Sequence, residues 1–500
     1  MRLVAVLLLV LSPVTLYADP SEDEIGFGDD AGFADLPSEA TPTTPPPTSP
    51  LSLTGLIRSD QGLWLERFSA APGPPLPGGN DNPFAKSRQS LDLTLDWKKG
   101  PVSARVASHG EFDLAYLVNA DSYDAATKEV YRELMQLREV WLNASLGAFE
   151  VHFGRQIVAW GEGDGASVVD VVNPRDLREP GLSDLEDIRV AVLATRVGWF
   201  HTTDTGDHRV ELIVVHETCN GLWAENCFGL RTPPMGPFSP LPAFFGDQGG
   251  GQLNLQGLLE GKQLRFTHDR DQLAWANQQP MLRWSYNGAG VDLGLYAASV
   301  LDQQGVLGAL DPVSLLDADV REVAIPLQHR RYQLFGTSGA LTTGDFLLKW
   351  ELAYGRSKPF NVQGAGPLPT IALSDTVEAL GSVTWRGLSN TVIGLEVTKL
   401  WLLDDPGPLL FPADAVTWSL RVNHDAMRER LHVSAVAVGF GLQAQYGWLA
   451  RADVRYDVID ALSVGVAYVH YEPGEEFGPL SGFDYHDRVA VQLRYAFSVL

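Results

Sequence analysis

The sequence predicts an all-β fold: a transmembrane antiparallel β-barrel of about 16 strands, within a range of roughly 14–18. Apolar and polar residues alternate with period two over segments of roughly 9–12 residues, which matches the length of a tilted strand that crosses a bilayer. Aromatic residues cluster toward the ends of these segments, and short connectors alternate with long ones. Aromatic girdles and alternating connector lengths are typical of membrane barrels, so these observations favour that architecture.

The amino-terminal residues differ in composition from the predicted barrel. Residues 1–18 have the features of a secretory signal peptide, with Arg2 followed by an apolar run and a small residue before the cleavage point. Residues 19–50 are acidic and Pro-rich and contain no Lys or Arg, so we expect a disordered periplasmic tether there. A partner-binding arm is the alternative for this stretch. The barrel is expected to cover residues 51–500.

Residues 448–457 show the alternation clearly, with apolar residues at even positions and charged residues at odd positions from Arg451. Side chains on a strand point alternately to its two faces, so each such segment has one apolar and one polar face. A membrane barrel turns the apolar face toward lipid, whereas a soluble sandwich turns it inward. The sandwich would be favoured if four leucines of these segments packed together in a dry interior. These are Leu93, Leu348, Leu420 and Leu493.

Charged residues on the polar faces are the predicted lining of a water-filled lumen. These residues are Lys349, Glu351, Arg421, Arg451, Asp453, Arg455, Asp457 and Arg494. We interpret them as a solvated wall held in cross-strand pairs, with an ion ladder for a charged solute as the alternative. The formal net charge of −25 at pH 7 disfavours nucleic acid as a partner, because an acidic surface repels phosphates.

The most distinctive stretch covers residues 137–177. Two strands are expected at 138–146 and 149–157, joined at Gly147 and followed by a Gly-rich, acid-containing segment. One interpretation is a loop that folds into the lumen and selects the solute; the alternative is a loop that only closes one end of the barrel. The candidate residues of this constriction are Arg155, Gln156, Trp160, Glu162, Asp170, Asn173 and Asp176.

Three short motifs in this stretch carry a family resemblance: Gly154-Arg155-Gln156, Trp160-Gly161-Glu162 and Asn173-Pro174-Arg175-Asp176. With the preceding strand hairpin, they resemble the outer-membrane proteins catalogued as domain of unknown function 1302, and more distantly the alginate-export barrels. The resemblance implies the outer membrane of a Gram-negative-type bacterium and a role in moving small or lipid-like molecules. It supplies no catalytic residues.

The expected function is therefore a non-enzymatic channel or conduit. An alginate- or polysaccharide-export-type channel is one alternative, and a barrel lipid hydrolase is another, although the sequence lacks a local Ser, His and acid cluster for it. Expected partners are outer-membrane lipid and the barrel insertion machinery, which reads a terminal strand such as that ending near Phe497. An inner-membrane transporter is a further candidate partner.

The two cysteines, Cys219 and Cys227, are expected to form a disulfide in an oxidising compartment, with two free thiols as the alternative. Closing so short a loop would stabilise it by roughly 2–3 kcal/mol. The sequence contains no motif of a metal or nucleotide site, so we expect no metal and no cofactor.

Overall fold

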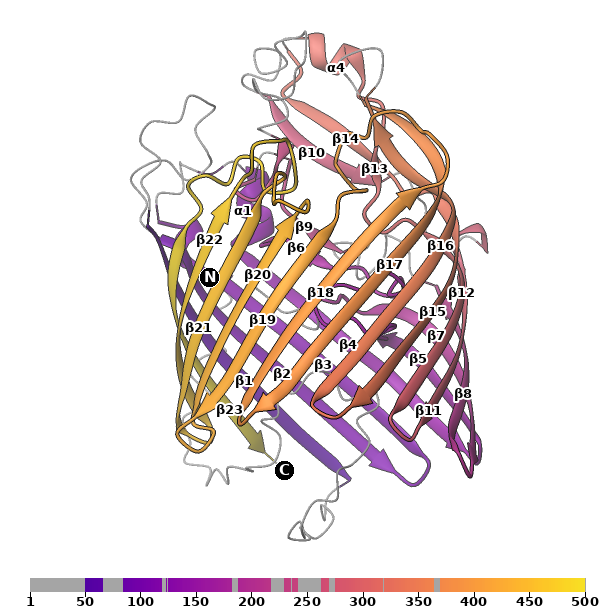
Figure 1. The fold of residues 1–500 in the computed structure, drawn as a ribbon. Coiled ribbons are helices and arrows are strands. Elements are labelled where there is room, and N and C mark those ends of the chain that lie inside the picture. Colours follow the sequence, from indigo (N-terminus) through magenta and orange to yellow (C-terminus); the bar gives the residue numbers. More distant parts are fainter. Residues whose placement is uncertain are drawn as a thin grey trace.

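The computed structural model describes most of the predicted barrel. The described residues are 50–65, 84–118, 123, 125–181, 188–216, 229–234, 236–241, 262–268, 275–317, 319–363 and 369–499. The predicted signal peptide and nearly all of the predicted tether lie outside them. Eighteen strands form one closed antiparallel sheet in which neighbours follow chain order (Figure 1). The fold is therefore the predicted barrel, with a strand number at the upper end of the expected range.

Strands of the barrel wall are long, as the alternating segments predict. In order around the wall they are β1 Leu51–Trp64, β2 Phe84–Lys99, β3 Val102–Asp113, β4 Glu133–Leu146, β5 Phe149–Gln156, β7 Val192–Thr203, β8 Gly206–Val215, β11 Gln279–Gly288, β12 Val291–Leu301, β15 Arg331–Thr343, β16 Phe346–Val362, β17 Thr370–Leu388, β18 Thr391–Leu402, β19 Thr417–Ala426, β20 Leu431–Phe440, β21 Trp448–Ile459, β22 Leu462–Glu472 and β23 Arg488–Val499. Strand β23 pairs antiparallel with β1 and closes the barrel.

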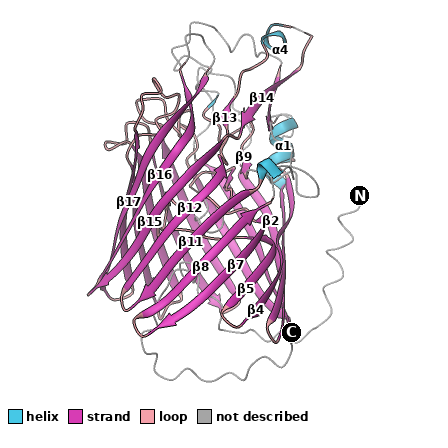
Figure 2. Ribbon diagram, turned by 90° about the vertical axis from the view of Figure 1, so that its right-hand side faces the viewer, coloured by secondary structure: helices cyan, strands magenta, loops and turns pink. Residues whose placement is uncertain are grey.

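Connectors differ at the two ends of the barrel (Figures 1 and 2). At the end where the chain terminates, neighbouring strands are joined by tight turns, such as the one at Gly147, whose φ of 63° suits glycine. The other end carries the longer connectors and the small elements. These are η1 Leu114–Tyr116, α1 Ala125–Tyr131, β6 Asp176–Leu177, β9 Leu230–Arg231, β10 Gln263–His268, η5 Trp275–Asn277, β13 Val306–Leu307, α4 Pro312–Leu316 and β14 Glu322–Gln328.

The exterior of the barrel is apolar. Leu420 is 43% exposed and Leu493 is 46% exposed, whereas Leu93 and Leu348 are half-buried, so these leucines do not form a dry core. Exposed apolar residues lie on strands all around the wall: Leu91, Val106, Leu142, Phe153, Leu212, Leu282, Leu295, Phe335, Leu352, Leu395, Val454, Val466 and Val491. A closed barrel with an apolar exterior is a protein of the outer membrane. Among the described residues, no helix is long and apolar enough to cross a bilayer.

Candidate functional site

The chain leaves the barrel wall at the end of β5 and crosses the lumen. We call residues 157–181 the inward segment. Gly154, two residues before the end of β5, has a φ of 134° and lies against β4. A Cβ at this position would overlap the backbone of Val140 and Trp141. Glycine is therefore required where the wall strand gives way to the inward segment.

Apolar side chains hold the first part of the inward segment against one wall. Trp160 is 1% exposed, and its ring centre lies 5.2 Å from that of Tyr296 on β12. The buried residues of this inner apolar cluster are Val158, Trp160, Val169, Val172, Val192, Ala194, Ile213, Val215, Met281, Tyr296, Ala298, Val300, Tyr332, Leu334 and Ala353. Burial of each large side chain contributes about 1.5–3 kcal/mol, so this packing fixes the segment in place.

A wall carboxylate on β16 binds the middle of the inward segment. Glu351 is 1% exposed, and its Oε1 accepts hydrogen bonds from the backbone N–H of Glu162 (2.6 Å) and Gly163 (2.9 Å). Its Oε2 accepts from the N–H of Val168 at 2.7 Å. A side chain at Gly161 would overlap Glu351, which explains the small residue there. Backbone N–H groups, together with the hydroxyl of Ser167 at 2.8 Å, thus satisfy this buried carboxylate.

A second wall carboxylate, Glu396 on β18, binds the tip of the same segment. It accepts from the backbone N–H of Asp164 (2.9 Å) and Ala166 (2.8 Å). The Asp164 side chain in turn pairs with Lys349 at 2.7 Å. Seven strands separate β5 from β18 in one direction around the barrel and nine in the other. The inward segment therefore reaches nearly the opposite wall.

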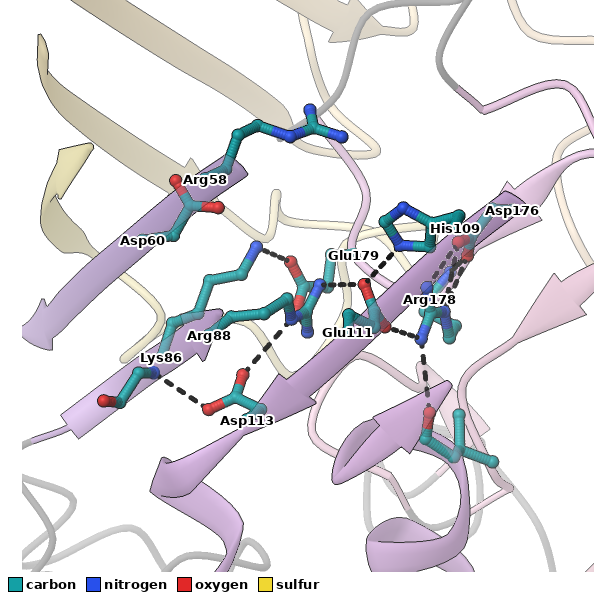
Figure 3. Close-up of polar contacts among 12 residues, drawn as sticks. Arg58, Asp60, Lys86, Arg88, His109, Glu111, Asp113, Asp176, Arg178 and Glu179 are labelled. Atoms are coloured by element: carbon teal, nitrogen blue, oxygen red, sulfur yellow. Dashed lines mark hydrogen bonds and ion pairs between the residues drawn. The ribbon is translucent and has the colours of Figure 1, made fainter. Parts of the chain in front are cut away.

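Buried ion pairs hold the end of the inward segment against β2 and β3 (Figure 3). Arg178 bonds Glu111 at 2.6 Å, and Glu179 bonds both Arg88 and Lys86 at 2.7 Å. Arg88 also lies 3.3 Å from Asp113. We call these six residues the ionic anchor. Each of their side chains is largely shielded from water, so the pairs are strong and depend on one another.

Electrostatics keep Glu179 of the ionic anchor ionised. Burial alone raises the pKa of Glu179, but Arg88 and Lys86 outweigh burial and hold its pKa well below the ordinary value. A lowered folded-state pKa stabilises the fold above the unfolded-state pKa, and this contribution is lost as the pH falls toward the folded-state value. The ion pairs of Glu179 are therefore intact at neutral pH and weaken only in strong acid.

The predicted constriction residues all lie on, or directly beside, the inward segment. Asn173 accepts from the N–H of Val158 at 2.7 Å and donates to the carbonyl of Val190 at 2.8 Å. Asp170 pairs with Arg189 at 3.0 Å. Gln156 donates a hydrogen bond to the carbonyl of Ala194 at 3.0 Å, and Glu162 accepts one from the hydroxyl of Ser338 at 3.4 Å. Asp176 forms an ion pair with Arg178 at 2.7 Å. Arg155 is buried, with 3% of its surface exposed.

Sequence reasoning missed several partners of the inward segment. Glu396 was not among the candidates, although it is an isolated acid between Leu395 and Val397 on an alternating strand. This isolation is the one signal in the sequence that could have identified Glu396, because an acid at an inward position of an otherwise apolar stretch needs a partner. Arg178 and Glu179 come shortly after the last of the three motifs and belong to none of them. Their roles depend on pairing with strands β2 and β3, which the local sequence does not reveal.

Several of the predicted lumen-lining charges form ion pairs, whereas Glu351 accepts hydrogen bonds from the inward segment. Arg451 lies 2.8 Å from Asp453, and Arg455 lies 3.7 Å from Asp457. A similar group surrounds the buried Glu211 of β8, whose carboxylate contacts Arg196 at 3.5 Å, Arg209 at 2.7 Å and Arg283 at 3.1 Å. Arg and Asp thus alternate along β21, whereas three arginines share one carboxylate at Glu211.

Family comparison agrees with this geometry. The model of a protein family described as "Protein of unknown function (DUF1302)" matches residues 79–401, which include the hairpin and the whole inward segment. The chain belongs to this family. No curated protein matches the chain.

Solved structures of outer-membrane proteins are similar at low sequence identity. Pseudomonas aeruginosa OccK8 (OprE) is 11% identical, with 90% of this chain and 98% of that chain covered and a TM-score of 0.47. Acinetobacter baumannii OccAB3 is 12% identical, with 90% and 99% covered and a TM-score of 0.46. Pseudomonas aeruginosa OpdK with vanillate is 11% identical, with 90% and 99% covered and a TM-score of 0.43.

Two further sequence predictions for this DUF1302 protein concern a disulfide and metal binding. Cys219 and Cys227 lie outside the described residues, so their pairing stays a prediction. Within the described residues, no group of three or more His, Cys, Asp or Glu side chains is arranged to hold a metal ion.

Asp302, directly after β12, provides a test of electrostatics in the longer connectors. Burial raises its pKa to about 6, although Lys358 acts in the opposite direction. Because the folded-state pKa is raised, stability falls as the pH rises from the ordinary value of about 4 toward 6. We expect Asp302→Asn to increase the free energy of unfolding by about 2–3 kcal/mol at pH 7. At pH 4 the change should be near zero. Denaturant titrations at both pH values measure this, and equal changes would contradict it.

Proposed function

We propose that this protein is an outer-membrane conduit for small or lipid-like molecules and that the inward segment forms its constriction. The observation that carries the proposal is the attachment of one segment to both sides of the lumen. Apolar packing around Trp160 holds it on one side, the carboxylates of Glu351 and Glu396 hold its middle, and the ionic anchor holds its end. A solute that moves along the barrel axis has to pass this segment.

Most of the charged side chains described in the lumen are paired. The carboxylates of Glu111 and Glu179 each contact basic side chains, and Asp453 pairs with Arg451. Opposite charges in contact largely cancel, whereas three arginines share the carboxylate of Glu211 and leave a surplus of positive charge beside it. We infer that size and polarity, more than charge, decide which molecules pass.

Removal of the inward segment tests the proposal directly. Replacement of residues 158–172 by a short Gly-Ser linker is expected to raise single-channel conductance severalfold in planar bilayers, because the obstruction is gone. Heat-modifiable migration in detergent verifies that the variant is folded. Unchanged conductance of a folded variant would show that the segment only closes one end of the barrel.

A further inference from the structure

Three polar side chains form a hydrogen-bonded chain across neighbouring strands of the barrel wall. The hydroxyl of Thr195 on β7 lies 2.8 Å from Nε2 of His216, which directly follows β8. Nδ1 of the same ring lies 2.5 Å from Oε1 of Gln278, which directly precedes β11. The backbone N–H of His216 also donates to the carbonyl of Leu193 at 2.9 Å, which fixes the histidine beside β7. We call Thr195, His216 and Gln278 the outer triad.

Strand register places the outer triad on the lipid-facing side of the wall. Thr195 pairs with Phe153 of β5, which is 53% exposed. On β8, Leu212 is 47% exposed, whereas Ile213 is buried in the inner apolar cluster, so even-numbered residues face outward and His216 continues their row. The ring centres of His216 and Phe153 lie 6.5 Å apart. Each member of the outer triad is half-buried, so the triad borders acyl chains rather than the lumen.

The outer triad lies where the apolar exterior meets the headgroup region. Strand β8 ends at Val215 and β11 begins at Gln279, both at the end of the barrel that carries the longer connectors (Figure 1). The longer loops of outer-membrane barrels face the outside of the cell. The outer triad is therefore level with the outer leaflet, near the boundary between acyl chains and headgroups, where lipid esters and water both occur.

The hydrogen bonds assign a role to each member of the outer triad. A carboxamide oxygen only accepts, so Nδ1 of His216 carries the ring proton and Nε2 keeps its lone pair. That lone pair faces the hydroxyl of Thr195 and is placed to take its proton. A hydroxyl nucleophile, a histidine base and an orienting oxygen in this order are the parts of a hydrolase triad. The local sequence does not show them, because three separate segments supply them.

We propose that the outer triad hydrolyses acyl esters of lipids in the outer leaflet, an activity that goes beyond the proposed conduit. The Thr195 oxygen attacks the ester carbonyl carbon while His216 takes the hydroxyl proton. Collapse of the tetrahedral intermediate breaks the bond to the lipid alcohol, which leaves with the proton from His216. Water then attacks the acyl-threonine, with His216 again as the base, and the fatty acid departs as Thr195 regains its proton. One ester and one water thus give one fatty acid and one alcohol.

Release of fatty acid from lipid tests the outer triad. Purified full-chain protein is mixed with detergent micelles that contain dioleoylphosphatidylethanolamine, or lipid A in a second arm, and the released acids are measured by mass spectrometry. We expect the wild type to release acid from at least one lipid, which identifies the source of the ester. Thr195→Val and His216→Gln should each lower the rate by at least about 100-fold. Thr195→Ser, which keeps a hydroxyl nucleophile, should retain activity.

Gln278 is a positioning residue in this proposal, because it touches His216 and not the ester. Gln278→Glu keeps an acceptor for Nδ1 of His216 and should retain most of the activity. Gln278→Leu removes the acceptor, so kcat should fall while KM stays close to the wild-type value. An equal loss in both variants would contradict this role.

The matched control is Thr391→Val. Thr391 also lies 2.8 Å from a histidine, His424, but it faces Nδ1 of that ring, and its hydroxyl donates to the carbonyl of Ser389. This variant should release acid at the wild-type rate, and heat-modifiable migration verifies the folding of every variant. No release by the wild type, or equal release by the wild type and folded Thr195→Val, would overturn the esterase. The conduit is tested separately, since Thr195→Val should leave single-channel conductance unchanged.

Discussion

Replacing both Glu351 and Glu396 with alanine is expected to raise single-channel conductance severalfold and to increase its fluctuations. These two carboxylates lie on the far wall and accept hydrogen bonds from backbone N–H groups of the inward segment. Each hydrogen bond to a charged group contributes about 1.5–3 kcal/mol, so their combined loss frees the middle of the segment while its two ends stay attached. Planar-bilayer recordings of purified protein measure the change.

Glu378→Ala is the matched control for this prediction. Glu378 is also a wall carboxylate, on β17 between the two strands concerned, but it pairs with Lys358 at 2.5 Å. We expect its replacement to leave conductance close to the wild-type value. The Glu351→Gln and Glu396→Gln pair, which keeps one acceptor oxygen at each site, should give an intermediate value. If the alanine and control variants behave alike, the two carboxylates do not hold the constriction.

Arg88→Met is expected to lower the free energy of unfolding by about 3–5 kcal/mol, because removal of one partner leaves buried charges uncompensated. Arg88 contacts Glu111, Asp113 and Glu179, and its side chain is only 9% exposed. Three carboxylates would then share Lys86 and Arg178. Denaturant unfolding in detergent, followed by heat-modifiable migration, measures the loss.

Arg132→Met supplies the comparison for Arg88→Met. Arg132 pairs with Glu133 at 2.7 Å, but both side chains are exposed, at 37% and 51%. An exposed pair contributes about 0–1 kcal/mol, so little stability should be lost. If the two substitutions cost the same, the ionic anchor does not stabilise the barrel through buried charge.

Period-two alternation was sufficient to predict the barrel, because lipid imposes the same requirement on every strand of the wall. It located the hairpin at Gly147 and the lipid-facing leucines, such as Leu420. The expected second strand of the hairpin extended to residue 157, whereas β5 ends at Gln156. That difference marks the place where tertiary contacts with the inward segment replace strand pairing.

The interior was less predictable than the wall. Polar residues are the rule on the lumenal face of a barrel, yet Ile213 and Met281 are buried in the inner apolar cluster that also contains Trp160 of the inward segment. Alternation alone cannot distinguish such an apolar inner face from an outer one. The partners Glu396 and Arg178 lie far in sequence from the residues they contact, so no local pattern identifies them.

Pairing of β1 with β23 also governs how the barrel is assembled. Residues such as Leu53 and Val499 become neighbours although nearly the whole chain separates them, and the ladder runs on to Trp64 and Arg488. Contacts of such long sequence separation form late and slowly, since the entropy of a very large loop has to be lost first. Until β23 arrives, β1 remains an open edge, so the nascent protein depends on protection from aggregation up to its last strand.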